Sequence, residues 1–227
     1  MLPTARDLRK QGYNMADSVK AVEGLLPANV NKIFESKHTI IKPITENEIN
    51  DRYLSWVNDK EINKYLIVRH NKQSINSLVN YINALRKKPN CDLFAVFTKK
   101  GNLHIGNMTI TNHNAHGQGT ADFGIMIGEK NAFAMGLGAE VHIVVLEYLF
   151  SDPNVFRINA GAIADNIVAC RTLDSLGYVR EGARRKTQLL ATGIRSDVNL
   201  YGLLRDEWYS SRKRMKNIID SIIIRDL

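Results

Sequence analysis

The chain has 227 residues, 44% of them hydrophobic, and no apolar run in it approaches the roughly 20 residues that a membrane helix needs. Its two cysteines, Cys91 and Cys170, cannot form a disulfide framework or a zinc site on their own, so we expect one main core, a reducing compartment and no metal. The 31 Lys and Arg residues against 23 Asp and Glu give a net charge of +8, which favours phosphorylated or acidic partners; because no nucleic-acid-binding motif accompanies the charge, nucleic acid is not an expected partner.

The N-terminal segment, residues 1–37, differs in pattern from the rest of the chain. Its beginning lacks the apolar core of a signal peptide, so we expect a cytoplasmic protein. Val19, Val22 and Leu25 share one helical face, Pro27 interrupts it, and a second short helix is expected at 30–36. The pattern predicts an N-terminal helical extension that either packs on the domain or a partner subunit, or acts as a lid or specificity element.

From residue 38 the turn and capping signals are clear. HTIIKPI predicts a strand, and Thr45 with Glu48 forms a capping box for a helix at 46–57. Ser74 caps a second helix, whose apolar residues recur at helical spacing up to Pro89. Three strands come next, beginning at 93, 103 and 121 and separated by turn residues, and they predict an antiparallel meander.

Residues 121–178 predict a strand, a glycine loop, an apolar helix at 138–150, a strand at 156–163 and a second helix. Gly136 and Gly138 let an anion approach the main chain, and the positive end of the following helix favours its charge, although both glycines also suit a tight turn. A terminal hairpin and a basic helix or tail at 211–227 complete the chain.

This order of elements, with the fragments YLSWVND, DFGIMIGEK, GLGAE and NIVACRTLDSLGYVREG, resembles the GNAT acetyltransferase superfamily over about residues 40–208. The branch it resembles contains the ribosomal-protein alanine acetyltransferases and the amino-sugar acetyltransferases. The resemblance implies an α/β GNAT fold at 38–210. Its mixed, mostly antiparallel sheet is flanked by helices and splayed between the fourth and fifth strands, here 121–127 and 156–163. It also implies acetyl-CoA as the cosubstrate.

The same resemblance assigns the cofactor site. Ile125 and Ile127 offer their backbones to the pantetheine and the thioester, and the backbone N–H of Met126 or Ile127 is the expected oxyanion donor. The residues expected around the pyrophosphate are Phe133, Ala134, Met135, Gly136, Leu137, Gly138 and Ala139. Phe133 replaces the family's usual Arg or Gln, which leaves the pyrophosphate to the backbone and to neighbours such as Lys130. The Asn166 side chain is expected either to contact the pantetheine or only to cap its helix.

Acetylation of an amine needs a base, because an amine with a pKa of about 10.4 is mostly protonated at neutral pH. Asp122 is the first candidate, acting directly or through water, since strand alternation places it on one face with Gly124 and Met126. An exposed carboxylate that only attracts a cationic substrate is the alternative. His113 and His116 in the preceding polar loop are further candidates.

The general acid does not carry over from the family. The position where relatives place a Tyr is Leu173, and the position where others place a Ser is Ala169. Cys170 and Tyr201 are therefore the remaining catalytic candidates, with water as the alternative proton donor. If the helix dipole and water suffice for thiolate release, Leu173→Tyr should alter the kinetics little.

For the acceptor we expect the primary amine of a small molecule, preferably an amino sugar, because the basic residues 184–186 suit a nucleotide diphosphate linked to it. Glu181 and Asp197 are candidates for binding the amine, or for pairing with Arg185 and Arg195 instead. A protein N-terminus is the alternative acceptor, and a non-catalytic acyl-CoA-binding module is the alternative function. A homodimer stays open.

Overall fold

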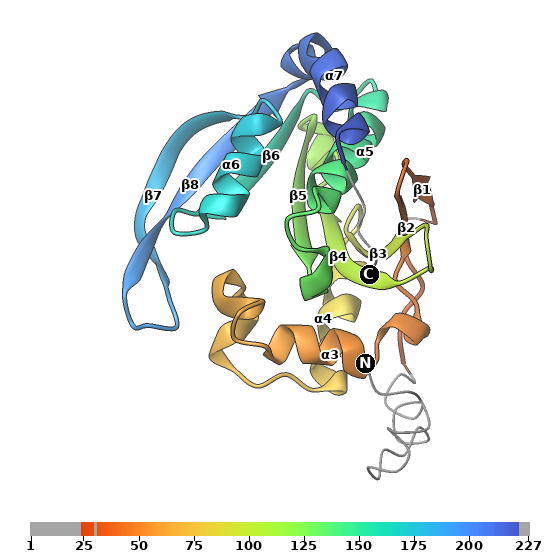
Figure 1. The fold of residues 1–227 in the computed structure, drawn as a ribbon, viewed down its shortest axis with the longest axis vertical. Coiled ribbons are helices and arrows are strands. Elements are labelled where there is room, and N and C mark those ends of the chain that lie inside the picture. Colours follow the sequence, from red (N-terminus) through yellow and green to blue (C-terminus); the bar gives the residue numbers. More distant parts are fainter. Residues whose placement is uncertain (1–23, 30, 223–227) are drawn as a thin grey trace.

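The computed structural model describes residues 24–29 and 31–222, and its elements surround one sheet (Figure 1). The strands are β1 (Phe34–Glu35), β2 (Thr39–Pro43), β3 (Asp92–Thr98), β4 (His104–Thr111), β5 (Thr120–Ile127), β6 (Arg157–Ile163), β7 (Val179–Leu189) and β8 (Arg195–Leu204). The α-helices are α3 (Asp51–Asn58), α4 (Ile75–Arg86), α5 (Leu137–Ser151), α6 (Ile167–Ser175) and α7 (Arg205–Asp220). Short 3-10 helices are η1 (Glu46–Glu48), η2 (Asn63–Tyr65), η3 (Ile67–His70), η4 (Ala115–Gly117) and η5 (Lys130–Ala132).

The sheet is mixed, with the order β1-β2-β3-β4-β5-β6-β8-β7. Every neighbouring pair is antiparallel except β5 and β6, which are parallel because α5 carries the chain from one to the other. The predicted meander of β3, β4 and β5 and the terminal hairpin of β7 and β8 are both confirmed. The predicted fold class is therefore confirmed as well.

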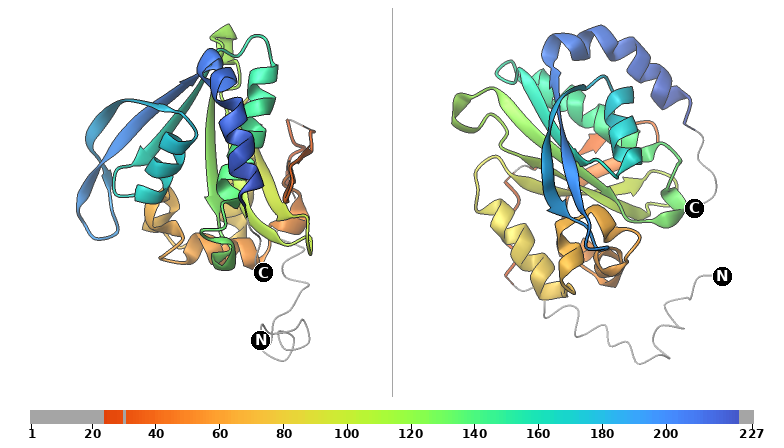
Figure 2. Two further views of the ribbon diagram at one scale, coloured as in Figure 1. Left: turned by 45° about the horizontal axis from the view of Figure 1, so that its top comes forward. Right: turned by 90° about the vertical axis from the view of Figure 1, so that its left-hand side faces the viewer.

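Helices cover both faces of the sheet (Figure 2), and an apolar cluster lies on each face. The first joins the sheet to α5, α6 and α7, with Leu146 and Trp208 fully buried in it. The second joins it to α3 and α4 through Trp56 and Ile82. Because α5 is apolar nearly all round, it can contact the sheet on one side and α7 on the other.

The sheet opens between β5 and β6. These strands pair at only three positions, the last joining Asp122 and Asn159, although β5 continues to Ile127 and β6 to Ile163. Beyond that point the facing N–H and C=O groups of the two strands lack each other as partners and suit an extended ligand. The splay lies where the sequence predicts it.

Two local predictions are wrong. The helix expected at 46–57 divides into η1, which has the predicted Thr45–Glu48 capping box, and α3, because Asn50 is extended and accepts hydrogen bonds from the N–H groups of Arg52 and Tyr53. In place of the helix expected around 30–36, β1 pairs with β2 at the edge of the sheet. The first predicted helix, with Val19 and Val22, lies outside the described residues.

No helix in residues 24–29 and 31–222 is both long and apolar enough to cross a bilayer. Over the same residues, no group of three or more His, Cys, Asp or Glu side chains is arranged to hold a metal ion.

Candidate active site

The glycine loop presents main-chain N–H groups in an arrangement suited to an anion, which we call the cradle. After η5, Ala134 and Gly136 both take left-handed backbone angles, with φ of 60° and 81°, and α5 then begins without any side-chain cap on its first N–H groups. Successive N–H groups in such a loop, at the positive end of a helix, are suited to a phosphate. The loop therefore fits the anionic part of CoA.

The two glycines of the loop differ in what the fold requires of them. At Gly136 a Cβ would have an unfavourable φ and would lie 3.1 Å from Cγ1 of Ile222, just beyond α7. At Gly138 a Cβ would meet Cγ1 of Ile127 at an ordinary 3.6 Å. The backbone angle therefore favours glycine at 136, whereas at 138 the fold tolerates a Cβ.

Lys130, a predicted neighbour of the pyrophosphate, pairs with two carboxylates. Its Nζ lies 2.9 Å from Oδ2 of Asp59 and 2.5 Å from Oε2 of Glu61, and these hydrogen bonds to Glu61 and Asp59 raise the pKa of the lysine. The ammonium group of Lys130 is therefore already paired in this structure. Phe133, at the first position of the loop, is exposed, with a relative accessibility of 44% for the residue.

Asn166 lies where β6 leads into α6. Its Oδ1 accepts a hydrogen bond from the N–H of Ala169 at 3.2 Å and so caps α6. Its Nδ2 has no hydrogen-bond partner in the part of the chain that the structure describes. The capping role is therefore observed, and the two N–H donors of Nδ2 remain for a ligand.

Asp122 lies at the closed end of the splay, on the face of the sheet away from α5. Its neighbour Phe123 packs on His142 of α5, with ring centroids 4.4 Å apart, whereas Met126 packs with the cluster of α3 and α4. The predicted alternation along β5 is therefore confirmed. Nδ2 of Asn112, at the end of β4, donates a hydrogen bond to Oδ2 of Asp122.

A cavity of about 450 Å³ opens beside Asp122. Four strands provide its walls, and the other residues that line it are Phe123, Arg157, Asn159, Ala160, Gly161, Glu181, Arg184, Val198, Leu200 and Tyr201. Its polar groups converge from β5, β6 and β7 on the closed end of the splay, which is the arrangement expected of a small-molecule site.

The acid candidates lie together, beneath α6. Cys170 is buried, and its Sγ accepts a hydrogen bond from Nδ2 of Asn199 at 3.5 Å. Tyr201 is only 3% exposed and contacts the thiol of Cys170. Burial, and to a smaller extent this contact, raises the pKa of the Tyr201 hydroxyl to about 12. Leu173 is packed in the same core. The pair therefore packs on the face opposite Asp122, and only Tyr201 also reaches the cavity wall.

The other candidate bases point elsewhere. His113 lies 3.2 Å from Oδ2 of Asp152 and packs edge-on against Tyr148 of α5, so it faces away from Asp122. His116 is exposed in η4. Asp197 accepts a hydrogen bond from the backbone N–H of Lys186.

Three polar residues at the site are not indicated by the sequence: Asn112, Arg157 and Asn159. Asn112 has a φ of 56°, an angle that asparagine tolerates better than most residues. An asparagine directly after a strand therefore indicates a turn, and this is the one sequence feature that could have drawn attention to it. Arg157 and Asn159 reach the cavity only because β6 pairs with β5 and β8, and no local pattern indicates that pairing.

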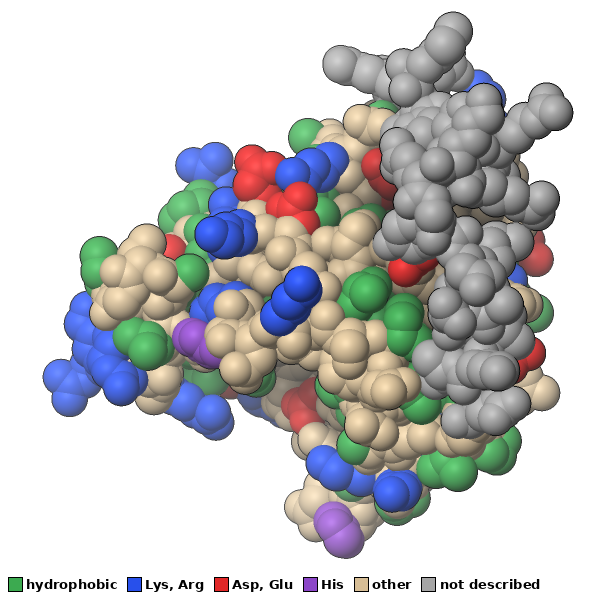
Figure 3. All heavy atoms as spheres, turned by 90° about the horizontal axis from the view of Figure 1, so that it is seen from below, with side chains coloured by type: hydrophobic (Ala, Val, Ile, Leu, Met, Phe, Trp, Pro, Cys, Tyr) green, Lys and Arg blue, Asp and Glu red, His purple; other side chains and the backbone are tan. Residues whose placement is uncertain are grey.

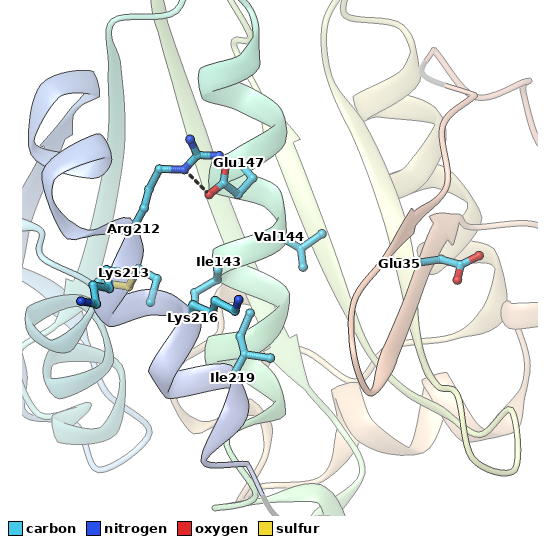
Figure 4. Close-up of a pocket in the computed structure, with 9 residues that line it drawn as sticks. Glu35, Ile143, Val144, Glu147, Arg212, Lys213, Lys216 and Ile219 are labelled. Atoms are coloured by element: carbon cyan, nitrogen blue, oxygen red, sulfur yellow. Dashed lines mark hydrogen bonds and ion pairs between the residues drawn. The ribbon is translucent and has the colours of Figure 1, made fainter.

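A larger cavity, of about 690 Å³, lies between α5, α7 and β1 (Figure 4). Its floor is apolar, with Ile143 and Met215, and its two acidic residues are both paired, Glu147 with Arg212 and Glu35 with Lys99. It offers no unpaired carboxylate and does not reach the splay, so it is not the candidate active site.

A sheet that parts between two parallel strands, beside a main-chain anion cradle, defines the class of protein: an acyltransferase that takes its acyl group from CoA. The model of the acetyltransferase (GNAT) domain matches residues 38–179, which is more than half of the chain. The chain belongs to the GNAT acetyltransferase family, and acetyl-CoA is its acetyl donor.

Relatives agree with this assignment. An uncharacterized N-acetyltransferase, p20 of Bacillus licheniformis, is 26% identical over 165 residues, which cover 72% of this chain and 91% of the relative. Among solved structures, a GCN5-related N-acetyltransferase from Brucella melitensis has a TM-score of 0.69 at 16% identity, covering 85% of this chain and 87% of that one.

Two further structures share the fold and come from proteins with different acceptors. The spermidine N-acetyltransferase of Vibrio cholerae, in complex with CoA and spermine, has a TM-score of 0.66 at 18% identity and covers 77% of this chain and 99% of its own. RimL, a ribosomal L7/L12 alpha-N-protein acetyltransferase in complex with CoA, has a TM-score of 0.67 at 14% identity and covers 78% and 99%.

Proposed function

We propose that this acetyltransferase acts on the primary amine of a small molecule, and that an amino sugar is the preferred acceptor. The observation that carries the proposal is the position of Asp122, beside a bounded cavity at the closed end of the splay. The carboxylate accepts the proton that the ammonium group must lose before the amine attacks.

The enclosure of the acceptor side favours a small molecule over a peptide. The β7–β8 hairpin and the start of α6 are tied to η2 and η3: Arg69 donates to the carbonyl of Leu189, and the Tyr65 hydroxyl donates to the carbonyl of Asp165 at 2.8 Å. These contacts narrow the space in which an extended polypeptide would lie. Acetylation of a protein N-terminus, as in RimL, is the competing acceptor class.

The cofactor roles that we propose rest on the same geometry. Bound acetyl-CoA supplies a thioester carbonyl for the amine to attack. The main chain of Ile125, Met126 and Ile127 faces the opening of the sheet; the backbone N–H of Met126 or Ile127 stabilises the developing oxyanion. The loop 133–139 holds the pyrophosphate, and the free Nδ2 of Asn166 donates to the pantetheine.

The departing thiolate also needs a proton, and the exposed face of α6 offers no dedicated side-chain acid to donate it. Cys170 and Tyr201 pack against each other, and the high pKa of Tyr201 keeps it protonated, so only Tyr201 remains a candidate through its place on the cavity wall. If Tyr201 does not act, water protonates the thiolate and the positive end of α6 stabilises its charge.

The test is a panel of acceptors incubated with acetyl-CoA and read by mass spectrometry: an amino sugar, a polyamine and a peptide with a free N-terminus. We expect the amino sugar to be acetylated, and Asp122→Asn to lower kcat by about 10²–10⁴-fold. Asp206→Asn, which removes an exposed carboxylate on α7, is the matched control and should leave kcat unchanged. Acetylated peptide without acetylated sugar would overturn the acceptor preference.

A further inference from the structure

Of the charged side chains that line the acceptor cavity, two pair with each other and two do not. Two acidic and two basic side chains line it: Asp122, Glu181, Arg157 and Arg184. Arg157 and Glu181 neutralise each other, since Nη1 lies 2.6 Å from Oε1 and Nη2 donates to Oε2. The pair lies over Gly202, where a Cβ would come within 2.5 Å of Nη2 of Arg157, so the fold makes room for this ion pair.

The remaining two charges are separated. Asp122 on β5 receives the amide of Asn112 but no cation, and Arg184 on β7 has no acidic partner, within residues 24–29 and 31–222. Arg184 pairs in register with Val198, which also lines the cavity, so both belong to the wall opposite Asp122. Within the described residues, a carboxylate without a cationic partner and a guanidinium without an acidic partner therefore line the same 450 Å³ cavity from different strands.

We infer that the acceptor carries a phosphoryl group as well as its amine, and that Arg184 binds the phosphoryl group. This inference rests on the proposed function, because it takes Asp122 as the partner of the amine. A guanidinium offers a planar pair of N–H donors that match two phosphate oxygens. A polyamine would meet a like charge at Arg184, and an amino sugar without an anionic group would leave the guanidinium without a partner.

The surrounding surface supports an anionic acceptor. Lys and Arg side chains gather over the β7–β8 hairpin, along the left edge of Figure 3, where Arg185, Lys186 and Arg195 are also exposed. These residues do not line the cavity. They raise the local concentration of an anion, whereas Arg184 is the one basic residue of the hairpin placed to select it.

Arg184→Gln tests the assignment, with Arg185→Gln as the matched control because it removes the same charge from the adjacent exposed position. Binding to the protein saturated with CoA is measured by calorimetry for glucosamine, glucosamine 1-phosphate and a nucleotide-linked amino sugar. We expect both phosphorylated amines to bind the unaltered protein more tightly than glucosamine does. Arg184→Gln should weaken them by about tenfold or more, and Arg185→Gln by less than about twofold.

Equal weakening by the two substitutions, or equal affinity for glucosamine and its phosphate, would overturn the inference. The two phosphorylated probes separate a sugar phosphate from a nucleotide diphosphate as the source of the phosphoryl group. Acetyl transfer to each probe is followed separately by mass spectrometry. Binding that depends on Arg184 without transfer to any amine would refute the proposed function and leave the phosphoryl site standing.

Discussion

Gly136→Ala separates the conformational role of the glycine loop from its proposed role in binding. The φ of 81° is one that a residue with a Cβ adopts at a cost of about 1–2 kcal/mol. For a chain of this size that cost lowers Tm by about 2–8 °C. The new Cβ would also lie 3.1 Å from Cγ1 of Ile222 and would shift the N–H groups that begin α5.

Gly193→Ala is the matched control, because Gly193 has the same φ of 81° in the β7–β8 turn and no atom near the position of a Cβ. Both variants should show a similar fall in Tm. Only Gly136→Ala should weaken acetyl-CoA binding, by about tenfold or more if one or two charge-assisted hydrogen bonds are lost. Calorimetric titration with acetyl-CoA checks this. Full affinity in Gly136→Ala, or an equal loss in Gly193→Ala, would refute the assignment of the loop.

Three further substitutions test the packing around the site. Gly128→Ala places a Cβ 2.1 Å from Cδ2 of Trp56, so we expect a loss of about 1–3 kcal/mol in urea unfolding and altered tryptophan fluorescence; an unchanged protein would contradict the contact. Leu173→Tyr inserts a hydroxyl into a well-packed core and should lower stability by about 1–3 kcal/mol without raising kcat, so a large increase in rate would show that the position serves an acid. His142 lies 2.9 Å from the Tyr178 hydroxyl, and burial lowers the pKa of this histidine to about 3. The unfolded chain therefore binds the extra proton below pH 6.5, and stability should fall by about 2 kcal/mol from pH 6.5 to pH 5; the double variant His142→Phe, Tyr178→Phe should lose this part of the slope.

Local chemistry explains which parts of the fold the sequence predicts. The Thr45–Glu48 box, the Ser74 cap and the Asn166 cap act within one turn of the chain, and all three are observed. The division between η1 and α3 was missed because Asn50 competes for the same backbone donors as a continuing helix would use. The caps and the interruption at Asn50 both depend on residues close in sequence. What is hard to predict is whether the helix continues or the Asn50 side chain takes its backbone donors.

At the site, features formed by consecutive residues can likewise be predicted from the sequence, whereas contacts between distant segments cannot. The cradle at Gly136 is predictable because its N–H groups come from consecutive residues. The state of Lys130 is not, since Asp59 and Glu61 belong to a segment about 70 residues earlier in the sequence. Likewise, a pattern on β7 cannot show that Glu181 meets Arg157 and leaves Arg184 unpaired, because β8 lies between their strands in the sheet.

Hydrogen bonds join the start of α5 to the segment between β1 and β2, at the edge of the sheet that β1 forms. Glu140, on the first turn of α5, is fully buried and accepts hydrogen bonds from the Ser36 hydroxyl and from the backbone N–H of His38 at 2.7 Å, while Nδ1 of His38 lies 2.7 Å from its other oxygen. A buried carboxylate is costly unless such partners satisfy it. Ser36 lies just before the first residue that the family model matches. The chain before that boundary therefore stabilises the first turn of α5, the helix that follows the glycine loop.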